Sequence, residues 1–201
     1  MLTHLDYTAF QWVNHLAITD HFMNPFMVFL ADKAEYLFFA GILFYWFFHK
    51  EQNRKMVASA CIAACLALAT NMIIGDFYYR SRPFVAHHVV MLISHAKNAS
   101  FPSDHATAAF VIAMTIWLWK KRDGWIWLIL AAGIGISRVW TGVHYPLDVI
   151  AGMVIGIVTA VVIYLLTARW GKLNQFIDVL INIYEKLESK IFNTTLIKSE
   201  K

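Results

Sequence analysis

Five long apolar stretches constrain this chain more than any other feature of its sequence. In order along the chain they are Glu35–Phe48, Met56–Ile74, Ala106–Trp119, Trp125–Trp140 and Leu147–Ala168. Hydrophobic residues make up 59% of the 201 residues and charged residues 15%, whereas soluble domains are about 45–50% apolar and about 25% charged. Stretches of this length can cross a bilayer as helices when polar flanking groups snorkel. The sequence therefore predicts an all-α, polytopic membrane helical bundle.

Basic residues in the connectors indicate which helix ends face the cytoplasm. Lys50, Arg54 and Lys55 follow the first stretch, Lys120, Lys121 and Arg122 follow the third, and Arg169 and Lys172 follow the fifth. By the positive-inside rule these connectors are cytoplasmic, which places residues 75–103 and 141–146 on the external side. The net charge of +4 is then explained by topology, and no nucleic-acid partner is predicted. Arg80, Arg82 and Lys97 are exceptions, because they fall in the predicted external loop.

The two ends of the chain differ from the apolar middle. Residues 1–34 are moderately amphipathic, and we expect them to lie in the outer interface or, through Asn24–Ala31, to form a sixth crossing interrupted at Asp32–Glu35. Residues 35–169 form the predicted transmembrane domain, which carries the motifs described below. Residues 170–201 are predicted to form a cytoplasmic amphipathic helix over Lys172–Phe192 and a polar tail. The alternative for that helix is a coil that joins two copies of the chain as a homodimer.

Several other residues are interpreted as structural. Cys61 and Cys65 lie four residues apart in an apolar stretch and are interpreted as small packing residues, because two cysteines are too few for a disulfide framework or a zinc site. Gly152 and Gly156 predict close packing of the last stretch against a neighbouring helix. Seven histidines are interpreted as solvated groups: His4, His15, His21, His49, His87, His88 and His95.

Polar and ionisable residues gather at three places, all on the predicted external side. Tyr79–Pro83 follows the second apolar stretch, Phe101–His105 precedes the third, and Ser137–Asp148 connects the fourth to the fifth. Ionisable groups near membrane spans are costly and usually functional. We therefore expect the three clusters to share one pocket. The alternative is that they cap helices and face solvent in the external loops.

The residue types in these clusters favour an anion site. The three arginines, Arg80, Arg82 and Arg138, would bring positive charge and forked donors that suit phosphate oxygens. Pro102-Ser103 precedes a helix, whose free N–H groups and positive dipole end favour an oxyanion. Four side chains could instead ligate a metal ion: Asp104, His105, His144 and Asp148. The arginines beside them would oppose a cation, so no metal and no other cofactor is predicted.

Two histidines in the clusters suit separate chemical tasks. His144 and Asp148 are four residues apart, so one helical turn would bring the carboxylate to the imidazole. Asp148 could then accept Nδ1–H and leave Nε2 as a nucleophile. His105 belongs to another stretch and is free to act as a general acid toward a leaving oxygen. This division predicts phosphoryl transfer through a phosphohistidine, with the arginines stabilising charge on the equatorial oxygens.

These residues resemble the type 2 phosphatidic-acid-phosphatase superfamily, which shares its pocket with the vanadium haloperoxidases. Its three motifs are Lys-x6-Arg-Pro, Pro-Ser-Gly-His and Ser-Arg-x5-His-x3-Asp. The third is complete in Ser137, Arg138, His144 and Asp148. The second is present as Pro102, Ser103 and His105 with Asp104 in the glycine position, and the first keeps Arg82-Pro83 but has Gly75 in place of the lysine. The resemblance covers about residues 56–168.

The resemblance implies a role for each matching residue and no requirement for a metal. His144 would be the nucleophile, Asp148 its orienting partner and His105 the acid, while Arg82, Ser103 and Arg138 would hold the phosphoryl group. Arg80 would replace the charge of the missing lysine. The role of Asp104 stays open, because a carboxylate beside a phosphate is repulsive unless it faces away or pairs with an arginine.

The Pro-Ser-Asp-His form and the small size resemble the bacitracin-resistance type of bacterial undecaprenyl-diphosphatase. This implies that a polyprenyl diphosphate lipid is hydrolysed to the monophosphate and inorganic phosphate at the external face of the plasma membrane, as part of the recycling of a cell-wall lipid carrier. Two alternatives stay open. One is a phosphatidic acid or phosphatidylglycerophosphate phosphatase, and the other is a non-catalytic lipid-phosphate carrier.

Overall fold

Helices account for every regular element in the computed structural model, which describes residues 2–48 and 51–199. In chain order they are α1 (Leu2–Thr19), the 3-10 turn η1 (His21–Met23), α2 (Asn24–Asp32), α3 (Glu35–Phe47), α4 (Glu51–Phe77), α5 (Pro83–Ala86), α6 (Asp104–Trp119), α7 (Lys121–Trp140), α8 (Pro146–Arg169) and α9 (Gly171–Ser199). The all-α prediction is confirmed. His49 and Lys50, which were expected in a cytoplasmic connector, lie outside the described residues.

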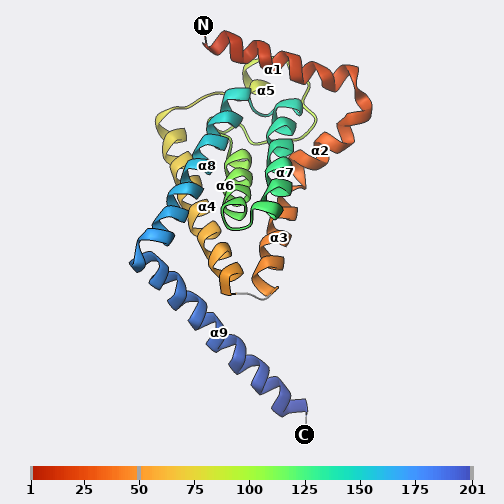
Figure 1. Cartoon of the computed structure of the whole chain (residues 1–201). Coiled ribbons are helices and arrows are strands. Elements are labelled where there is room, and N and C mark those ends of the chain that lie inside the picture. The colour runs from red at the N-terminus through yellow and green to blue at the C-terminus, as the bar shows by residue number, and fades with distance from the viewer. Residues whose placement is uncertain (1, 49–50, 200–201) are drawn as a thin grey trace.

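Helix α6 lies at the centre of the bundle, with α4, α7 and α8 packed around it (Figure 1). It buries apolar residues on several sides between Ala106 and Ile116, as expected for a helix enclosed by others. Helix α8 approaches it at two glycines. A Cβ at Gly152 would lie 2.6 Å from the Ser103 carbonyl oxygen, and one at Gly156 would lie 2.7 Å from that of Thr107. The prediction of close packing at these glycines is confirmed.

The apolar stretches correspond to α3, α4, α6, α7 and α8. Helices α4 and α8 are long and apolar enough to cross a membrane, and α3 is a shorter apolar helix. Two boundaries differ from expectation. Helix α7 begins at Lys121, so most of the basic connector is its first turn, and α9 continues through the expected polar tail to Ser199. Lysine and arginine are good helix formers, which explains why the basic connector is helical.

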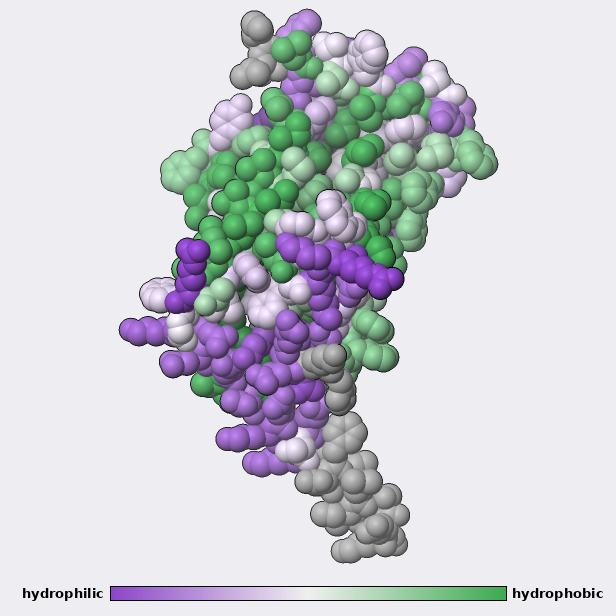
Figure 2. Space-filling model, in the orientation of Figure 1, coloured by the Kyte–Doolittle hydropathy of each residue, from purple (hydrophilic) through white to green (hydrophobic). Residues whose placement is uncertain are grey.

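Apolar side chains cover much of the middle of the molecule, while hydrophilic side chains gather toward the end where α9 packs (Figure 2). The many large apolar side chains that the helices expose indicate a protein that lies in a membrane. Cys61 and Cys65 are exposed free thiols. Helix α4 turns Ala60, Ala63 and Ala67 inward, and the two cysteines fall outside that face. The interpretation of Cys61 and Cys65 as packing residues is therefore wrong.

Helix α9 extends away from the other helices (Figure 1) and is attached by residues between Ile177 and Glu188. Ile177 and Ile181 are buried. Three ion pairs reinforce this contact: Arg54–Glu185 at 2.7 Å, Arg54–Glu188 at 3.1 Å and Lys55–Asp178 at 2.9 Å. The amphipathic pattern of α9 therefore serves, over part of its length, to dock the helix on α4 and α8.

Helices α1 to α3 cover one end of the bundle and one of its sides. Helix α1 lies across the end where α5 is found, and α2 and α3 run along α7 toward the opposite end (Figure 1). The buried side chain of Asn14 fixes α1 in place, since its amide nitrogen donates to the carbonyl oxygens of Val90 and Trp140, both at 2.8 Å. Its amide oxygen accepts from the Val90 N–H at 3.0 Å. The described part of the N-terminal segment, residues 2–34, is thus packed into the fold.

Candidate active site

The three polar clusters meet at the end of the bundle that α1 covers. Arg82 precedes α5, Ser103 caps α6, Arg138 lies in the last turn of α7, His144 lies just before α8, and Asp148 lies in its first turn. All five are at most 4% exposed. Arg82 Nη1 lies 3.0 Å from His144 Nε2, and the Ser103 N–H donates to the Asp148 carbonyl oxygen at 3.0 Å. The three clusters therefore meet at one buried place in the structure.

A tight turn between α7 and α8 brings His144 back beside Arg138. The N–H groups of Val143 and His144 both donate to the Arg138 carbonyl oxygen, at 3.2 Å. Gly142 makes this turn with φ of +83°, and a Cβ there would lie 2.4 Å from the Val90 carbonyl oxygen. Only glycine adopts such a backbone conformation without strain and also leaves this space free. The turn that carries His144 therefore requires Gly142.

The contacts of His144 define which ring nitrogen carries the proton. A guanidinium can only donate, so Nε2 must accept from Arg82 Nη1 and the proton of the neutral ring lies on Nδ1. Nδ1 faces Asp148 Oδ2 at 3.5 Å, a separation that catalytic pairs often show before substrate binds. Burial lowers the pKa of His144 well below its ordinary value of 6.5, and the positive charges of Arg138 and Arg82 lower it further. His144 thus presents an unprotonated Nε2.

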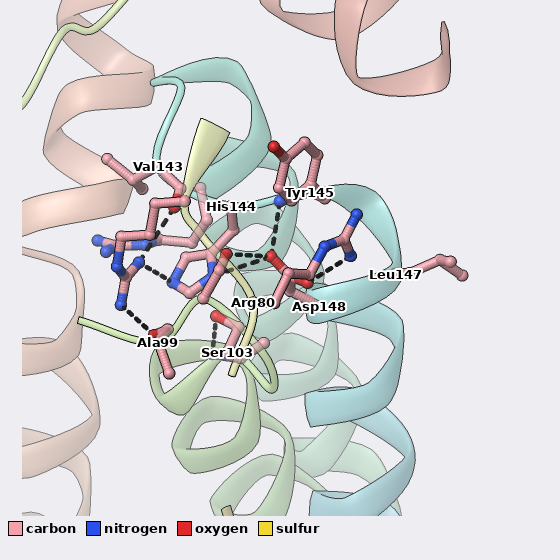
Figure 3. Close-up of polar contacts among 12 residues, drawn as sticks. Arg80, Ala99, Ser103, Val143, His144, Tyr145, Leu147 and Asp148 are labelled. Carbon is pink, nitrogen blue, oxygen red and sulfur yellow. Dashed lines mark hydrogen bonds and ion pairs between the residues drawn. The ribbon is translucent and has the colours of Figure 1, made fainter. Parts of the chain in front are cut away.

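The carboxylate of Asp148 is held on both oxygens. Oδ2 accepts from the Ser100 hydroxyl and from the Tyr145 N–H at 2.9 Å, and Oδ1 accepts from Arg80 Nη1 at 2.8 Å (Figure 3). The Tyr145 bond also caps the start of α8. Asp148 is fully buried, and these donors offset the cost of burying its charge. Its orientation toward His144 is therefore fixed by the surrounding fold.

Arg80 lies on the side of Asp148 away from His144 (Figure 3). Its second guanidinium nitrogen donates to Asp6, and its guanidinium carbon lies 3.9 Å from the centre of the Tyr145 ring. Asp6 is 4% exposed, and its other oxygen accepts from the Leu147 N–H at 2.9 Å. Arg80 thus faces two carboxylates, so this geometry gives no support to its expected role as a phosphate ligand and favours a role in positioning Asp148.

Arg138 brings unpaired hydrogen-bond donors into the pocket. Its side chain is 1% exposed, and Nη1 donates to the Ala31 carbonyl oxygen at 2.7 Å. Among the residues that the structure describes, Nε and Nη2 have no hydrogen-bond partner. The Ala31 carbonyl is available because α2 ends at Asp32, and the last carbonyls of a helix lack partners within it. Buried unpaired donors on a cation are costly, which suits a site that binds an anion.

Arg82 is held by the loop that precedes α6 and by the turn that carries His144. Nε donates to the Asn98 side chain at 3.0 Å and Nη2 to the Ala99 carbonyl oxygen at 3.1 Å. Nη1 also donates to the Val143 carbonyl oxygen at 3.0 Å. Since a guanidinium carries five N–H donors, one Nη2 hydrogen is left by these contacts. Arg82 is therefore rigidly placed directly in front of the His144 ring.

His105 lies on α6 beside an acidic residue that sequence reasoning missed. Its Nε2 is 3.5 Å from Glu35 Oε2, at the start of α3. The two residues line a small cavity between α2, α3, α6 and α7. Its other lining residues are apolar: Leu30, Phe38, Phe39, Ala108, Ala109, Ile112 and Ile134. His105 therefore stands where an apolar cavity meets the polar pocket.

His95 belongs to the site, although its sequence context suggested a solvated loop. Its ring centre lies 6.1 Å from that of His144 and 6.4 Å from that of His105. The interpretation of His95 as a solvated group is wrong, because the loop before α6 folds back over the pocket. His4, His15, His21 and His88 are exposed as predicted. His87 is exposed too, with its ring stacked on Tyr7 at 4.0 Å between centres.

The substituted motif positions lie on the α4 side of the pocket. Asp104 Oδ1 accepts from the Asn71 side chain at 2.9 Å, so its carboxylate has a neutral partner on α4. Gly75, in place of the family's lysine, lines a cavity of about 520 Å³ together with Asp104 and Tyr79. Ser103 accepts from the Ala106 N–H at 3.5 Å and caps α6. Among the described residues, no group of three or more His, Cys, Asp or Glu is arranged to hold a metal ion.

Three comparisons with known proteins agree with one another. Residues 56–172 match the model of the PAP2 superfamily. The chain is 38% identical over 188 residues to the bacitracin transport permease protein BcrC of Bacillus licheniformis, covering 93% of this chain and 91% of that one. It is 35% identical to the undecaprenyl-diphosphatase BcrC of Bacillus subtilis, covering 93% and 95%. The crystal structure of Aquifex aeolicus LpxE superposes with a TM-score of 0.63 at 26% identity, covering 80% and 94%.

Proposed function

Because the chain belongs to the PAP2 superfamily, we propose that it is a membrane phosphatase that hydrolyses undecaprenyl diphosphate to undecaprenyl phosphate and inorganic phosphate. The substrate is that of the named diphosphatase relative, which matches this chain over nearly its whole length. The observation that carries the proposal is the unprotonated His144 Nε2, which faces the Arg82 guanidinium at 3.0 Å. A nucleophile beside a buried cation suits attack on a phosphoryl group.

In the first step, His144 Nε2 attacks the terminal phosphorus and the bond from phosphorus to the bridging oxygen breaks. The bridging oxygen leaves with the lipid monophosphate and takes a proton from His105. Asp148 accepts Nδ1–H of His144 and stabilises the positive charge that the ring gains. Arg82 and Arg138 stabilise the charge on the non-bridging oxygens. A phosphoryl oxygen would take over the Arg82 hydrogen that His144 Nε2 accepts in the structure.

In the second step, water attacks the phosphohistidine. His105, now neutral, takes a proton from this water, the nitrogen–phosphorus bond breaks, and inorganic phosphate leaves. Glu35 Oε2 lies 3.5 Å from His105 Nε2 and would help to orient this ring as it alternates between acid and base. No step uses a metal ion or a cofactor.

The cavity beside His105 suits the lipid part of the substrate. Its apolar walls lie on the side of the pocket where the leaving group must depart, because His105 gives its proton to that group. An undecaprenyl chain could stay among apolar side chains while the diphosphate enters the polar pocket. Catalytic contacts to the phosphoryl group are common to many lipid phosphates, so a phosphatidic acid or phosphatidylglycerophosphate phosphatase is the second candidate.

The proposal includes a topology of five or six membrane crossings with the active site on the external face of the plasma membrane. Basic residues at the α9 end, among them Arg54, Lys121 and Arg169, indicate that this end is cytoplasmic. The site lies at the opposite end, under α1. Helix α9 would lie on the cytoplasmic side, and its exposed apolar residues, which include Phe176, Leu180 and Leu187, would face lipid or a second copy of the chain.

The proposal is tested by phosphate release from the purified protein in detergent with excess EDTA. Undecaprenyl diphosphate and phosphatidic acid are compared, with H144A as the blank and H88A, an exposed histidine variant, as the matched control. Release from the diphosphate that is lost in H144A and kept in H88A supports the proposal. Preference for phosphatidic acid would indicate that the protein acts in phospholipid metabolism. No release from either lipid, with retained lipid binding, would indicate a carrier.

A further inference from the structure

His95 is placed with the catalytic histidines by three separate observations. Its ring lies at similar distances from the rings of His144 and His105, 6.1 Å and 6.4 Å between centres, and is steeply inclined to both, by 76° and 64°. Its side chain is partly buried. Burial lowers the pKa of His95, and the charges of Arg82 and Arg138 lower it further, against an opposing contribution from the Ala96 carbonyl. The three rings therefore border the same space.

One nitrogen of His95 is free to act in that space. Nδ1 lies 3.2 Å from the Ala96 carbonyl oxygen, and a carbonyl oxygen can only accept, so Nδ1 carries a hydrogen. Nε2 is then the nitrogen left for a ligand. In the neutral ring Nε2 carries no hydrogen, so His95 takes up a proton when a phosphate oxygen approaches, and Nε2 then donates a charge-assisted hydrogen bond. The bond to the Ala96 carbonyl oxygen fixes the His95 ring and leaves its Nε2 edge available to a ligand.

A diphosphate needs donors for two phosphate groups, and the arginines described above account for one. Arg82 and Arg138 lie around His144, where the terminal group must be attacked. Arg80 is paired with Asp6 and Asp148. The second phosphate stays attached to the lipid and departs past His105, and the His95 ring lies at similar distances from the rings of His144 and His105. The leaving phosphate would therefore lie against His95.

We propose that His95 binds the second phosphate group of a diphosphate substrate and so makes the site select lipid diphosphates over lipid monophosphates. This inference rests on the proposed function for the identity of the biological substrate. The binding step itself requires only a ligand with two linked phosphate groups. It gives the loop between α5 and α6 a direct part in specificity, through a residue outside the three sequence motifs.

The first experiment measures ligand binding by calorimetric titration of the full chain in detergent. The probes are methylenediphosphonate, a diphosphate analogue that cannot be hydrolysed, and inorganic phosphate. In H95A we expect the affinity for the diphosphonate to fall about tenfold, since one hydrogen bond to a charged group is lost, while affinity for phosphate changes by less than about twofold. H95Q, whose amide can donate a hydrogen bond from a similar position, should recover part of the loss, and H88A should match the wild type.

The second experiment compares kcat/KM for undecaprenyl diphosphate and phosphatidic acid in the same variants. A selective loss on the diphosphate in H95A supports the inference. An equal loss on both lipids would indicate a structural role and overturn it, as would unchanged binding of the diphosphonate. If the wild type binds the diphosphonate selectively through His95 but releases no phosphate from the lipid diphosphate, the proposed function fails and the binding site stands. If the lipid diphosphate is hydrolysed but its selection does not depend on His95, the proposed function stands and the inference about His95 fails.

Discussion

Replacing Asp6 by asparagine is the most direct test of how the N-terminal helix supports catalysis. Asp6 is buried and accepts from both Arg80 and the Leu147 N–H. Asparagine has one acceptor oxygen and an amide group that opposes the other donor. The change therefore removes one charge-assisted hydrogen bond from a pair of groups that hold Asp148 and its chain neighbour.

The size of the expected loss of activity follows from the hydrogen bonds that D6N removes and those that it keeps. A hydrogen bond to a charged group contributes about 1.5–3 kcal/mol, or about ten- to a hundredfold in a rate or equilibrium constant. Asp148 Oδ2 keeps its bonds from Ser100 and the Tyr145 N–H, so we expect the lower end of this range. The D6N variant should show a kcat about tenfold below the wild type, with KM nearly unchanged, because Asp6 does not face the phosphate pocket.

Phosphate release with undecaprenyl diphosphate measures this effect, with D20N as the control at an exposed aspartate in the same segment. Since Asp6 acts through Arg80, the double variant D6N/R80Q should lose no more activity than R80Q alone. Fully additive losses, a rise in KM instead of a fall in kcat, or a D6N variant as active as D20N would refute the reasoning.

Three further results are expected. Because the pKa of His144 is lowered well below its ordinary value of 6.5, its nucleophilic form persists as the pH falls, so the decline of kcat/KM on the acid side should be half-maximal below pH 6.5; an acid-side half-maximal point above 6.5 would contradict this. G142A should destabilise the protein by about 1–3 kcal/mol in thermal unfolding, because φ is +83° and Val90 is in the way, whereas G171A, with open space around it, should not. R138Q should weaken inhibition by vanadate at least about tenfold, measured by phosphate release. Equal inhibition of the wild type and R138Q would show that Arg138 does not bind the phosphate.

The helices and the proximity of His144 to Asp148 were predictable because each has a strong local signal. Long apolar stretches specify membrane helices with little help from tertiary contacts, and the spacing of His144 and Asp148 is one helical turn. The meeting of three clusters at one end followed from topology, since charge in the connectors fixes which helix ends lie together.

The supporting contacts were not predictable, because they depend on where separate helices pack. Asp6 looks like any acidic residue on an amphipathic helix, and Glu35 looks like a helix-start residue at an interrupted span. The Ala31 carbonyl that holds Arg138 is a backbone group with no sequence signature. Arg80 illustrates the same limit, since its sequence position gives its charge but not the side of Asp148 that it faces.

The loop that carries His95 could not be interpreted from sequence for a different reason. Residues 87–99 form no helix or strand in the structure, so no periodicity indicates which side chains point inward. A histidine in such a loop is usually solvated. Only the folding of the loop over the pocket distinguishes His95 from its exposed neighbour His88.

The bond between Asp6 and the Leu147 N–H joins residues 141 positions apart, and this separation orders the biogenesis of the enzyme. During synthesis, Asp6 on α1 receives this partner only when α8 begins to emerge, on the order of ten seconds later at ordinary rates of synthesis. Until then Arg80 and Asp148 lack their N-terminal anchor. A chain that stalls or inserts incompletely before α8 therefore cannot assemble the complete catalytic centre, and full activity reports that insertion has reached α8.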